Sequence, residues 1–222
     1  MHIKGLAEKH VDGIIYISGQ NEIKEISEIK NLPIVYIDRA PKNAEVLILS
    51  DNETGGYLAG RELIAKGCTK ILFLRDIRYA STIRSRMERF MRALAEIGIS
   101  FSEEREMSCF PDYEETRGVM ERLLREQGCC FDGIFTTNDM MALACINVLM
   151  ENRIKVPDQV RVVGFDYISL SQFASPQITT IAQDTKELAL HAGETILKMI
   201  EGKEIRKKKT IIPVRLIARG TT

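Results

Sequence analysis

The chain has 222 residues, which is enough for one large α/β domain or for two smaller lobes with ample core. Its 31 lysines and arginines balance 31 aspartates and glutamates, so no net charge attracts the whole chain to nucleic acid or to an anionic membrane. No apolar run approaches the roughly 18 residues of a membrane-spanning helix, and no secretory signal opens the chain. We therefore expect a cytoplasmic protein with no membrane partner.

Apolar runs of strand length alternate with helical patterns along almost the whole chain. In chain order, the predicted strands cover Gly13–Ile17, Ile34–Asp38, Val46–Leu49, Ile71–Leu74, Met107–Phe110, Gly133–Thr136, Val160–Phe165, Thr179–Ala182 and Ile211–Ile217. The predicted helices lie between them, over Asn21–Lys30, Gly56–Lys66, Ile83–Ile97, Tyr113–Glu126, Met140–Glu151 and Lys186–Ile200. Repeated strand–helix units predict an α/β fold with parallel, doubly wound sheets and right-handed crossovers.

The start of the chain departs from this alternation. A short helical piece, Ile3–His10, leads directly into the first predicted strand, where a doubly wound lobe would normally begin with a strand of its own. Only three strands precede Asp51. We therefore expect the first lobe to be incomplete at its N-terminus, with an exposed sheet edge.

Two of the predicted helices carry distinct apolar patterns. In the last one, Leu188, Ala192, Ile196 and Met199 form a single stripe, and Gly202 lies just beyond its end, as a C-terminal stop should. The helix Met140–Glu151 is apolar almost all round, so it should be covered on more than one side. We expect its own sheet on one side and a second copy of the chain on the other. This predicts a homodimer interface near the loop Ile168–Ser175, with the contact residues Leu143, Asn147 and Leu170.

Polar side chains follow three of the predicted strands at their carboxyl ends. Asp38 follows the strand that starts at Ile34, Asn138 and Asp139 follow the strand that starts at Gly133, and Asp166 follows Val160–Phe165. Ligands of open α/β sheets bind at this rim. The loop Arg75–Arg86, with Ser81, Thr82, Arg84 and Arg86, could reach it too. Carboxylate, amide and guanidinium groups together suit a ligand rich in hydroxyls, such as a sugar or a nucleoside.

Each of these groups also has a purely structural interpretation. Asp38 and Asp166 could cap the turns that follow them. Either Asn138 or Asp139 is expected to be the N-cap of the helix that starts at Met140. Arg84 and Arg86 could belong to a solvated helix start. Only the joint pattern favours a binding site.

Signatures of catalysis and of cofactor binding are missing from the sequence. The three histidines, His2, His10 and His191, do not follow strand ends, and no nucleophile elbow, phosphate loop or dinucleotide motif is present. Gly55, Gly56 and Gly60 lack phosphate-loop spacing and are better explained by helix packing, and the basic run 206–209 by a solvated loop. The five cysteines lack zinc-ligand spacing and are expected to be reduced, although adjacent Cys129 and Cys130 leave a redox-sensitive pair open. We expect no enzyme activity, no cofactor and no metal.

A series of motifs runs in order through nearly the whole chain, from about Val11 to Thr222. They are V-D-G-I-I, I-V-Y-I-D-R, D-N-E-T-G-G, L-I-A-K-G, K-I-L-F-L, R-M-E-R-F, F-T-T-N-D-M-M-A, V-P-D-Q-V-R-V-V-G-F-D, I-T-T-I-A-Q and I-P-V-R-L-I-A-R. In this combination the chain resembles the effector-binding domain of the lactose/galactose-repressor family, which has the fold of type I periplasmic sugar-binding proteins. The resemblance implies two lobes joined by three crossovers, over residues 1–50 with 183–209 and over residues 51–182 with 210–222.

The resemblance also implies a set of ligand-binding residues. The family's ligand-contacting arginine, asparagine and strand-end aspartate fall on Arg86, Asn138 and Asp166, while Asp38, Thr82 and Gln183 match positions that line the cleft in relatives. The chain departs from the family at Arg89, where glycine is usual, and at Tyr167, often a second aspartate. These departures leave the ligand class open.

The resemblance implies a non-enzymatic effector-binding and dimerisation domain of a bacterial transcription regulator. The expected effector is a sugar, a sugar phosphate or a purine-like metabolite. Relatives carry an N-terminal helix-turn-helix, a hinge helix and two further strands, so operator DNA is expected to bind only through a domain missing from this chain. The alternatives are a solute-binding receptor of a sugar transporter with the same fold, and an enzyme on a doubly wound fold.

Overall fold

The computed structural model describes residues 5–6, 8–17, 32–38 and 44–222. The expected helix Asn21–Lys30 lies outside the described residues, as does part of the expected helical piece Ile3–His10. The protein divides into two compact units. Unit 1 comprises Met1–Asp51, Ala80–Thr82 and Asp184–Pro213, and unit 2 comprises Asn52–Tyr79, Ile83–Gln183 and Val214–Thr222.

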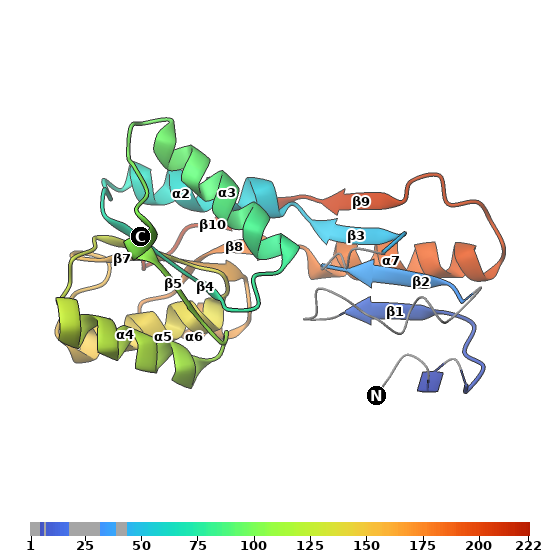
Figure 1. Ribbon diagram of the computed structural model, residues 1–222, viewed down its shortest axis with the longest axis horizontal. Helices are drawn as coiled ribbons and strands as arrows, with labels where there is room; N and C mark the ends of the chain where they lie inside the picture. The colour runs from blue at the N-terminus through green and yellow to red at the C-terminus, as the bar shows by residue number, and fades with distance from the viewer. Residues whose placement is uncertain (1–4, 7, 18–31, 39–43) are drawn as a thin grey trace. The chain divides into compact units, whose positions relative to one another are not determined.

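Unit 1 is built on a parallel sheet with the strand order β1-β2-β3-β9 among the described residues (Figure 1). The strands are β1 (Ile14–Ile17), β2 (Ile34–Ile37), β3 (Leu47–Ser50) and β9 (Lys209–Ile212). Helix α7 (Thr185–Ile200) buries Leu188, Ala192 and Ile196 in one cluster with strand residues such as Val35 and Ile48. The predicted apolar stripe is thereby confirmed, and the chain turns after the helix at Gly202, where φ is +70°.

Unit 2 is built on a larger sheet with the order β10-β8-β7-β6-β4-β5. Its strands are β4 (Ile71–Asp76), β5 (Glu106–Cys109), β6 (Gly133–Thr136), β7 (Arg161–Asp166), β8 (Thr179–Gln183) and β10 (Val214–Ile217). All neighbouring strands are parallel except β10, which is antiparallel to β8. One parallel and one mainly parallel sheet, with helices between the strands in sequence, confirm the predicted fold class.

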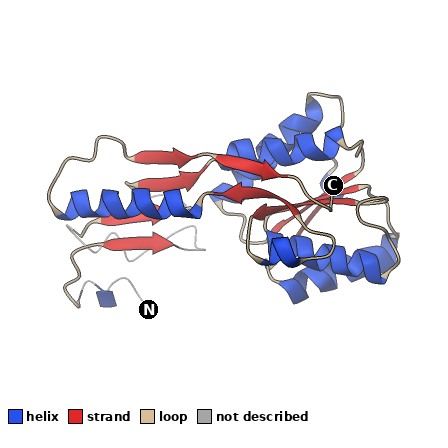
Figure 2. Cartoon of the chain, turned by 180° about the vertical axis from the view of Figure 1, so that it is seen from behind, coloured by secondary structure: helices blue, strands red, loops and turns tan. Residues whose placement is uncertain are grey.

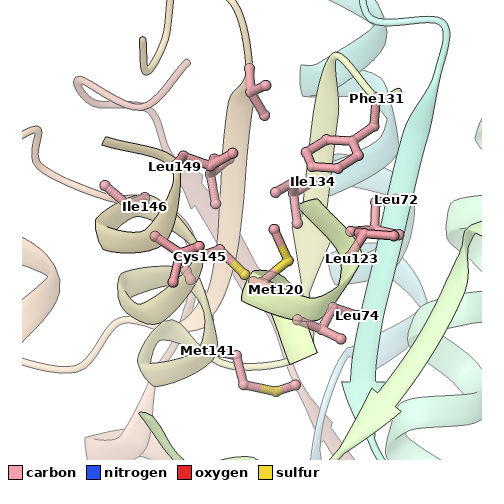
Figure 3. Packing of buried hydrophobic residues seen from close by; sticks show 14 of the residues in the cluster. Leu72, Leu74, Met120, Leu123, Phe131, Ile134, Met141, Cys145, Ile146 and Leu149 are labelled. Carbon is pink, nitrogen blue, oxygen red and sulfur yellow. The ribbon is translucent and has the colours of Figure 1, made fainter. Parts of the chain in front are cut away.

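Helices cover both faces of the sheet of unit 2 (Figure 2). They are α2 (Asn52–Ala65), α3 (Ser81–Ala95), α4 (Tyr113–Gln127), α5 (Asp139–Glu151) and the short α6 (Leu170–Phe173), with a single 3₁₀ turn at Glu103–Arg105. Alternation along β4 divides the core, because Ile71 and Phe73 face α2 and α3 whereas Leu72 and Leu74 face α4 and α5 (Figure 3). None of the helices in the described part of the chain is both long and apolar enough to span a bilayer.

The last predicted strand is wrong in one respect. The expected single strand Ile211–Ile217 is two strands in different sheets, because β9 ends at Ile212 beside β3 and β10 begins at Val214 beside β8. Pro213 lies between them and has no N–H to donate to a ladder. Residues 210–212, expected with the second lobe, therefore pair with β3, and Pro213 also belongs to unit 1.

The glycines of α2 serve helix packing, as the sequence indicated. A Cβ on Gly56 would lie 2.0 Å from the carbonyl oxygen of Arg86 in α3, and a Cβ on Gly55 would lie 2.6 Å from the ring of Phe165. Such distances are closer than side chains tolerate, so only glycine lets α2 approach α3 and β7 this closely. The helix begins at Asn52, four residues earlier than predicted, and includes these glycines.

Helix α5 packs against its own sheet, as predicted, and also against α4 of the same chain. Met141, Cys145 and Leu149 are buried in the cluster that contains β4 and β6, and α4 packs against the same helix through Met120 and Leu123 (Figure 3). The apolar character of α5 alone therefore does not require a second copy of the chain. The homodimer stays a prediction.

Candidate functional site

Three of the predicted ligand-binding residues lie together at the carboxyl ends of β7 and β8 in unit 2. Asp166 is the last residue of β7, and its Oδ1 accepts a hydrogen bond of 2.7 Å from Nε2 of Gln183, the last residue of β8. Arg86 comes from α3, with Nη1 3.9 Å from the same Oδ1. Adjacent parallel strands end at one edge of a sheet, which explains why residues 17 positions apart meet here.

Arg86 is buried, with only 3% of its surface exposed. Its Nε donates to Oδ1 of Asn52 at 2.7 Å, its Nη1 donates to the carbonyl oxygen of Thr137 at 2.6 Å, and its guanidinium carbon lies 3.5 Å from the ring centroid of Phe165. A planar guanidinium suits this combination of directed bonds and stacking. The alternative of a solvated helix start is therefore wrong for Arg86, whereas Arg84 is exposed in α3.

The chain around Asp166 has an uncommon backbone conformation. Asp166 has a φ of +104° and Tyr167 a φ of +63°, although neither is glycine. Two such residues in succession cost of order 1–3 kcal/mol each and persist only where the surroundings hold them. The Asp166 side chain is 32% exposed, against 4% for that of Arg86. A carboxylate that is both fixed and accessible can accept hydrogen bonds from a ligand.

Asn138 is the N-cap of α5, which confirms the structural alternative considered for it. Its Oδ1 accepts from the backbone N–H of Met141 at 2.7 Å, and its Nδ2 donates to the carbonyl oxygen of Pro111 at 3.3 Å. Asn138 directly follows Thr137 in sequence, and the carbonyl oxygen of Thr137 accepts the hydrogen bond from Arg86. Both ends of the Asn138 amide therefore already have partners within the protein.

Thr82 is buried near the start of α3. The sequence predicted a polar loop over Arg75–Arg86, but α3 already begins at Ser81. Strand β4 continues to Asp76, which pairs with Arg78 through Nη2 and Oδ2 at 2.6 Å. Arg84 lies 5.7 Å above the ring of Tyr79. These contacts organise a short turn between β4 and α3 in place of a long loop.

Asp38 belongs to unit 1, at the end of β2. It has a φ of +65°, and its backbone N–H donates to the carbonyl oxygen of Ile48 at 3.0 Å. Its Oδ1 is buried without a hydrogen-bond partner within the described part of the chain. A buried carboxylate oxygen without a donor is costly in an isolated protein, so it is a candidate acceptor for a ligand hydroxyl.

The residues predicted for a dimer interface have different surroundings. Leu143 is half-buried beside the core cluster of α4 and α5, and Asn147 donates to Oη of Tyr113 at 2.8 Å. Leu170 is 48% exposed on α6, next to Phe173, which is 81% exposed. The apolar surface of this region is therefore on α6 more than on α5.

Sequence reasoning missed the roles of Asn52 and Asp139. Asn52 is buried and holds Arg86, and Asp139 is a fully buried carboxylate whose Oδ2 accepts from the backbone N–H of Ile168 at 2.9 Å. Burial raises the pKa of Asp139 to about 6. The D-N-E-T-G-G and N-D motifs contain both residues, but their partners lie about 30 positions away in sequence.

Among the described residues, no group of histidine, cysteine and carboxylate side chains could hold a metal ion. All five cysteines are free thiols, with Cys68, Cys109 and Cys145 buried and Cys129 and Cys130 exposed.

Comparisons with known proteins agree with this fold and with each other. A family model for a periplasmic binding protein-like domain matches residues 61–222. The chain is 32% identical over 209 residues to the HTH-type transcriptional repressor PurR of Histophilus somni (strain 2336), covering 91% of this chain and 62% of that protein. It is 29% identical over 221 residues to the ribose operon repressor of Lactococcus lactis subsp. lactis (strain IL1403), covering 99% of this chain and 65% of that protein.

Among solved structures, a periplasmic binding protein/LacI transcriptional regulator from Alkaliphilus metalliredigens QYMF, complexed with D-xylulofuranose, has a TM-score of 0.85 and 26% sequence identity. That comparison covers 99% of this chain and 81% of the other. The chain spans less than two thirds of the length of the PurR repressor and of the ribose operon repressor.

Proposed function

This chain belongs to the periplasmic binding protein-like domain family, in the form that lactose/galactose-type repressors carry, and from that premise we propose that it binds a small effector for a bacterial transcription regulator. The observation that carries the proposal is the cluster of Asp166, Gln183 and buried Arg86 at the carboxyl ends of β7 and β8. We propose that units 1 and 2 are the two lobes of this domain.

The proposed ligand is a small molecule with several hydroxyl groups, with a sugar as the first class to test. Asp166 is the group that accepts from ligand hydroxyls, because its carboxylate is partly exposed while Gln183 and Arg86 fix its direction. The ribose operon repressor and the regulator complexed with D-xylulofuranose support a sugar. Sugar phosphates and purine-like metabolites are the other two classes.

We propose three further residues as ligand contacts. In unit 1, Asp38 has a buried Oδ1 without a hydrogen-bond partner among the described residues. Thr82 supplies a hydroxyl from α3, and Asn138 supplies its side-chain amide beside its capping bond. Each is an expectation from the family resemblance, and each can be tested by substitution.

We propose that the chain acts without catalysis and without a cofactor, which the repressor names of its relatives support. In a whole regulator, an effector that binds one arrangement of the protein more tightly shifts the population toward that arrangement. An effector with equal affinity for both arrangements would shift nothing. We propose that such a regulator contacts DNA through a separate helix-turn-helix domain. We also propose that it works in the cytoplasm.

We also propose that two copies of the chain pair through α6 and the adjoining side of α5. Leu170 and Phe173 supply exposed apolar surface on α6. Leu143 and Asn147 lie on α5, which contacts α6. Apolar surface gathered on one element is typical of a homodimer contact.

The proposed function is tested by titration calorimetry of the chain against sugars, sugar phosphates and purine nucleosides. We expect one class to bind, and Asp166→Asn to weaken binding about tenfold or more, because a charge-assisted acceptor contributes about 1.5–3 kcal/mol. Asp158→Asn, an exposed aspartate of the same unit, is the matched control and should bind as the wild type does. Absence of binding across all three classes, or turnover of a bound compound that Asp166→Asn abolishes, would contradict the proposal.

A further inference from the structure

Asp139 joins three elements of unit 2 through a buried carboxylate. It is the first residue of α5 and has no exposed surface. Its Oδ1 accepts from Oγ1 of Thr180 on β8 at 2.5 Å, and its Oδ2 accepts from the backbone N–H of Ile168, just after β7, at 2.9 Å. The carboxylate therefore fastens the chain that follows Asp166.

The segment fastened in this way is the strained one. Asp166 and Tyr167 both have positive φ, and the amide that donates to Asp139 belongs to the next residue, Ile168. If the bond to Asp139 were lost, relaxation of Asp166 and Tyr167 toward ordinary backbone angles would lower the free energy of the chain. The Asp166 carboxylate would then turn away from Gln183, because its direction depends on those angles.

Gly164 on β7 makes room for this carboxylate. A Cβ at Gly164 would lie 2.2 Å from Oδ1 of Asp139 and 3.3 Å from Cβ of Ala142, so any other residue would push α5 from the strand. The glycine is thus explained by Asp139 and not by a turn. In the sequence G-F-D at the end of β7, the glycine leaves space for Asp139 and the final residue is Asp166.

We propose that Asp139 is a positioning residue for effector binding, whose ionised carboxylate holds the turn after β7 and so keeps Asp166 directed toward the ligand. This inference rests on the proposed function of the site. Asp139 does not contact the ligand itself; it acts through the backbone of Ile168, directly after the strained residues.

The pH dependence follows from the charge of Asp139. The pKa of Asp139 is raised to about 6, because burial outweighs the polar groups of Thr180, Ile168 and Tyr167 and the nearby charge of Arg219, which lower it. Arg219, from the segment after β10, lies with its guanidinium carbon 5.0 Å from the ring centroid of Tyr167. The ionised form holds the turn, so effector affinity should be full well above pH 6 and should decrease as the pH falls through this value.

The test compares effector affinity of the wild type and Asp139→Asn between about pH 7.5 and about pH 5. Asparagine keeps the shape and can donate to Oγ1 of Thr180, so the variant should fold, which thermal unfolding checks. We expect affinity about tenfold weaker at the higher pH. We also expect the variant to lack the decrease near pH 6 that the wild type shows. Equal affinities with identical pH profiles would overturn the inference.

Thr180→Val provides a second test, which distinguishes a positioning role of Asp139 from a purely structural one. It removes one hydrogen bond to the ionised carboxylate but keeps its charge and nearly its volume, so the pKa of Asp139 should rise. The midpoint of the affinity decrease should therefore move to higher pH. An unchanged midpoint in a folded variant would contradict the positioning role.

Hydrogen exchange of the ligand-free chain separates this inference from the proposed function. In Asp139→Asn, the amide of Ile168 should exchange about tenfold faster than in the wild type, because it loses a charged acceptor. If no compound binds the wild type, the proposed function fails and the inference with it. If a compound binds but both variants behave as the wild type, only the inference fails.

Discussion

At the scale of single residues, Arg86 has the most demanding environment in the candidate site. Its guanidinium meets an amide oxygen of Asn52, a carbonyl oxygen of Thr137 and the ring of Phe165 in three different directions. A buried charge is tolerated only when such partners replace the water that it loses. The structure of this rim therefore depends on the shape of the guanidinium as much as on its charge.

Arg86→Lys is accordingly expected to destabilise the chain by about 3 kcal/mol. Lysine keeps the charge but cannot bond to Asn52 and Thr137 while stacking on Phe165. Urea unfolding measures the change. Arg125→Lys is the matched control, because Arg125 is 73% exposed, and it should alter the unfolding free energy by less than about 0.5 kcal/mol. Equal stability of the two variants would contradict this account of Arg86.

The residues of the site could be predicted only where they follow a strand. Asp166 was predicted from the strand that it ends, whereas Gln183 was named by family resemblance, and the two meet because β7 and β8 are neighbouring parallel strands. Arg86 was named from the polar loop after β4 and by family resemblance, and its burial was not foreseen. Asn52 and Asp139 act through hydrogen bonds to residues 34 and 29 positions away. Local sequence carries no signal for such distant partners.

At the scale of elements, the close approach of α2 and α3 is set by glycine. We expect Gly56→Ala to destabilise unit 2 by about 1–3 kcal/mol, because its Cβ would lie 2.0 Å from the carbonyl oxygen of Arg86. Gly118→Ala is the control, since Gly118 is an exposed glycine of α4 with no atom within 4 Å of the added Cβ. That control should stabilise the helix by about 0.5–1 kcal/mol.

Thermal or urea unfolding of the two glycine variants gives opposite signs if helix packing is the reason for Gly56. A stabilising effect in both would mean that α2 can move away from α3 without cost. The same glycines explain why the start of α2 was predicted four residues late, because Gly55 and Gly56 are poor helix formers. Their packing role overrides that propensity.

At the scale of the whole molecule, the alternation of strands and helices predicted the two parallel sheets, because fully buried strands read as continuous apolar runs such as Val160–Phe165. The same reasoning could not predict which surface covers a given helix. The side of α5 away from its own sheet was attributed to a second copy, whereas α4 of the same chain packs against this helix. Pairing between elements of one chain and pairing between two chains bury the same residue types.

The assembly of two chains is therefore best tested on α6. Leu170→Glu should convert the proposed homodimer to monomers, because the introduced charge would be buried in the contact. Ile97→Glu is the matched control, since Ile97 and Leu170 are both 48% exposed but only Leu170 lies on α6. Light scattering over a range of concentrations measures the mass of each variant. A wild type that is monomeric throughout, or a Leu170→Glu variant that still dimerises, would refute an interface on α6.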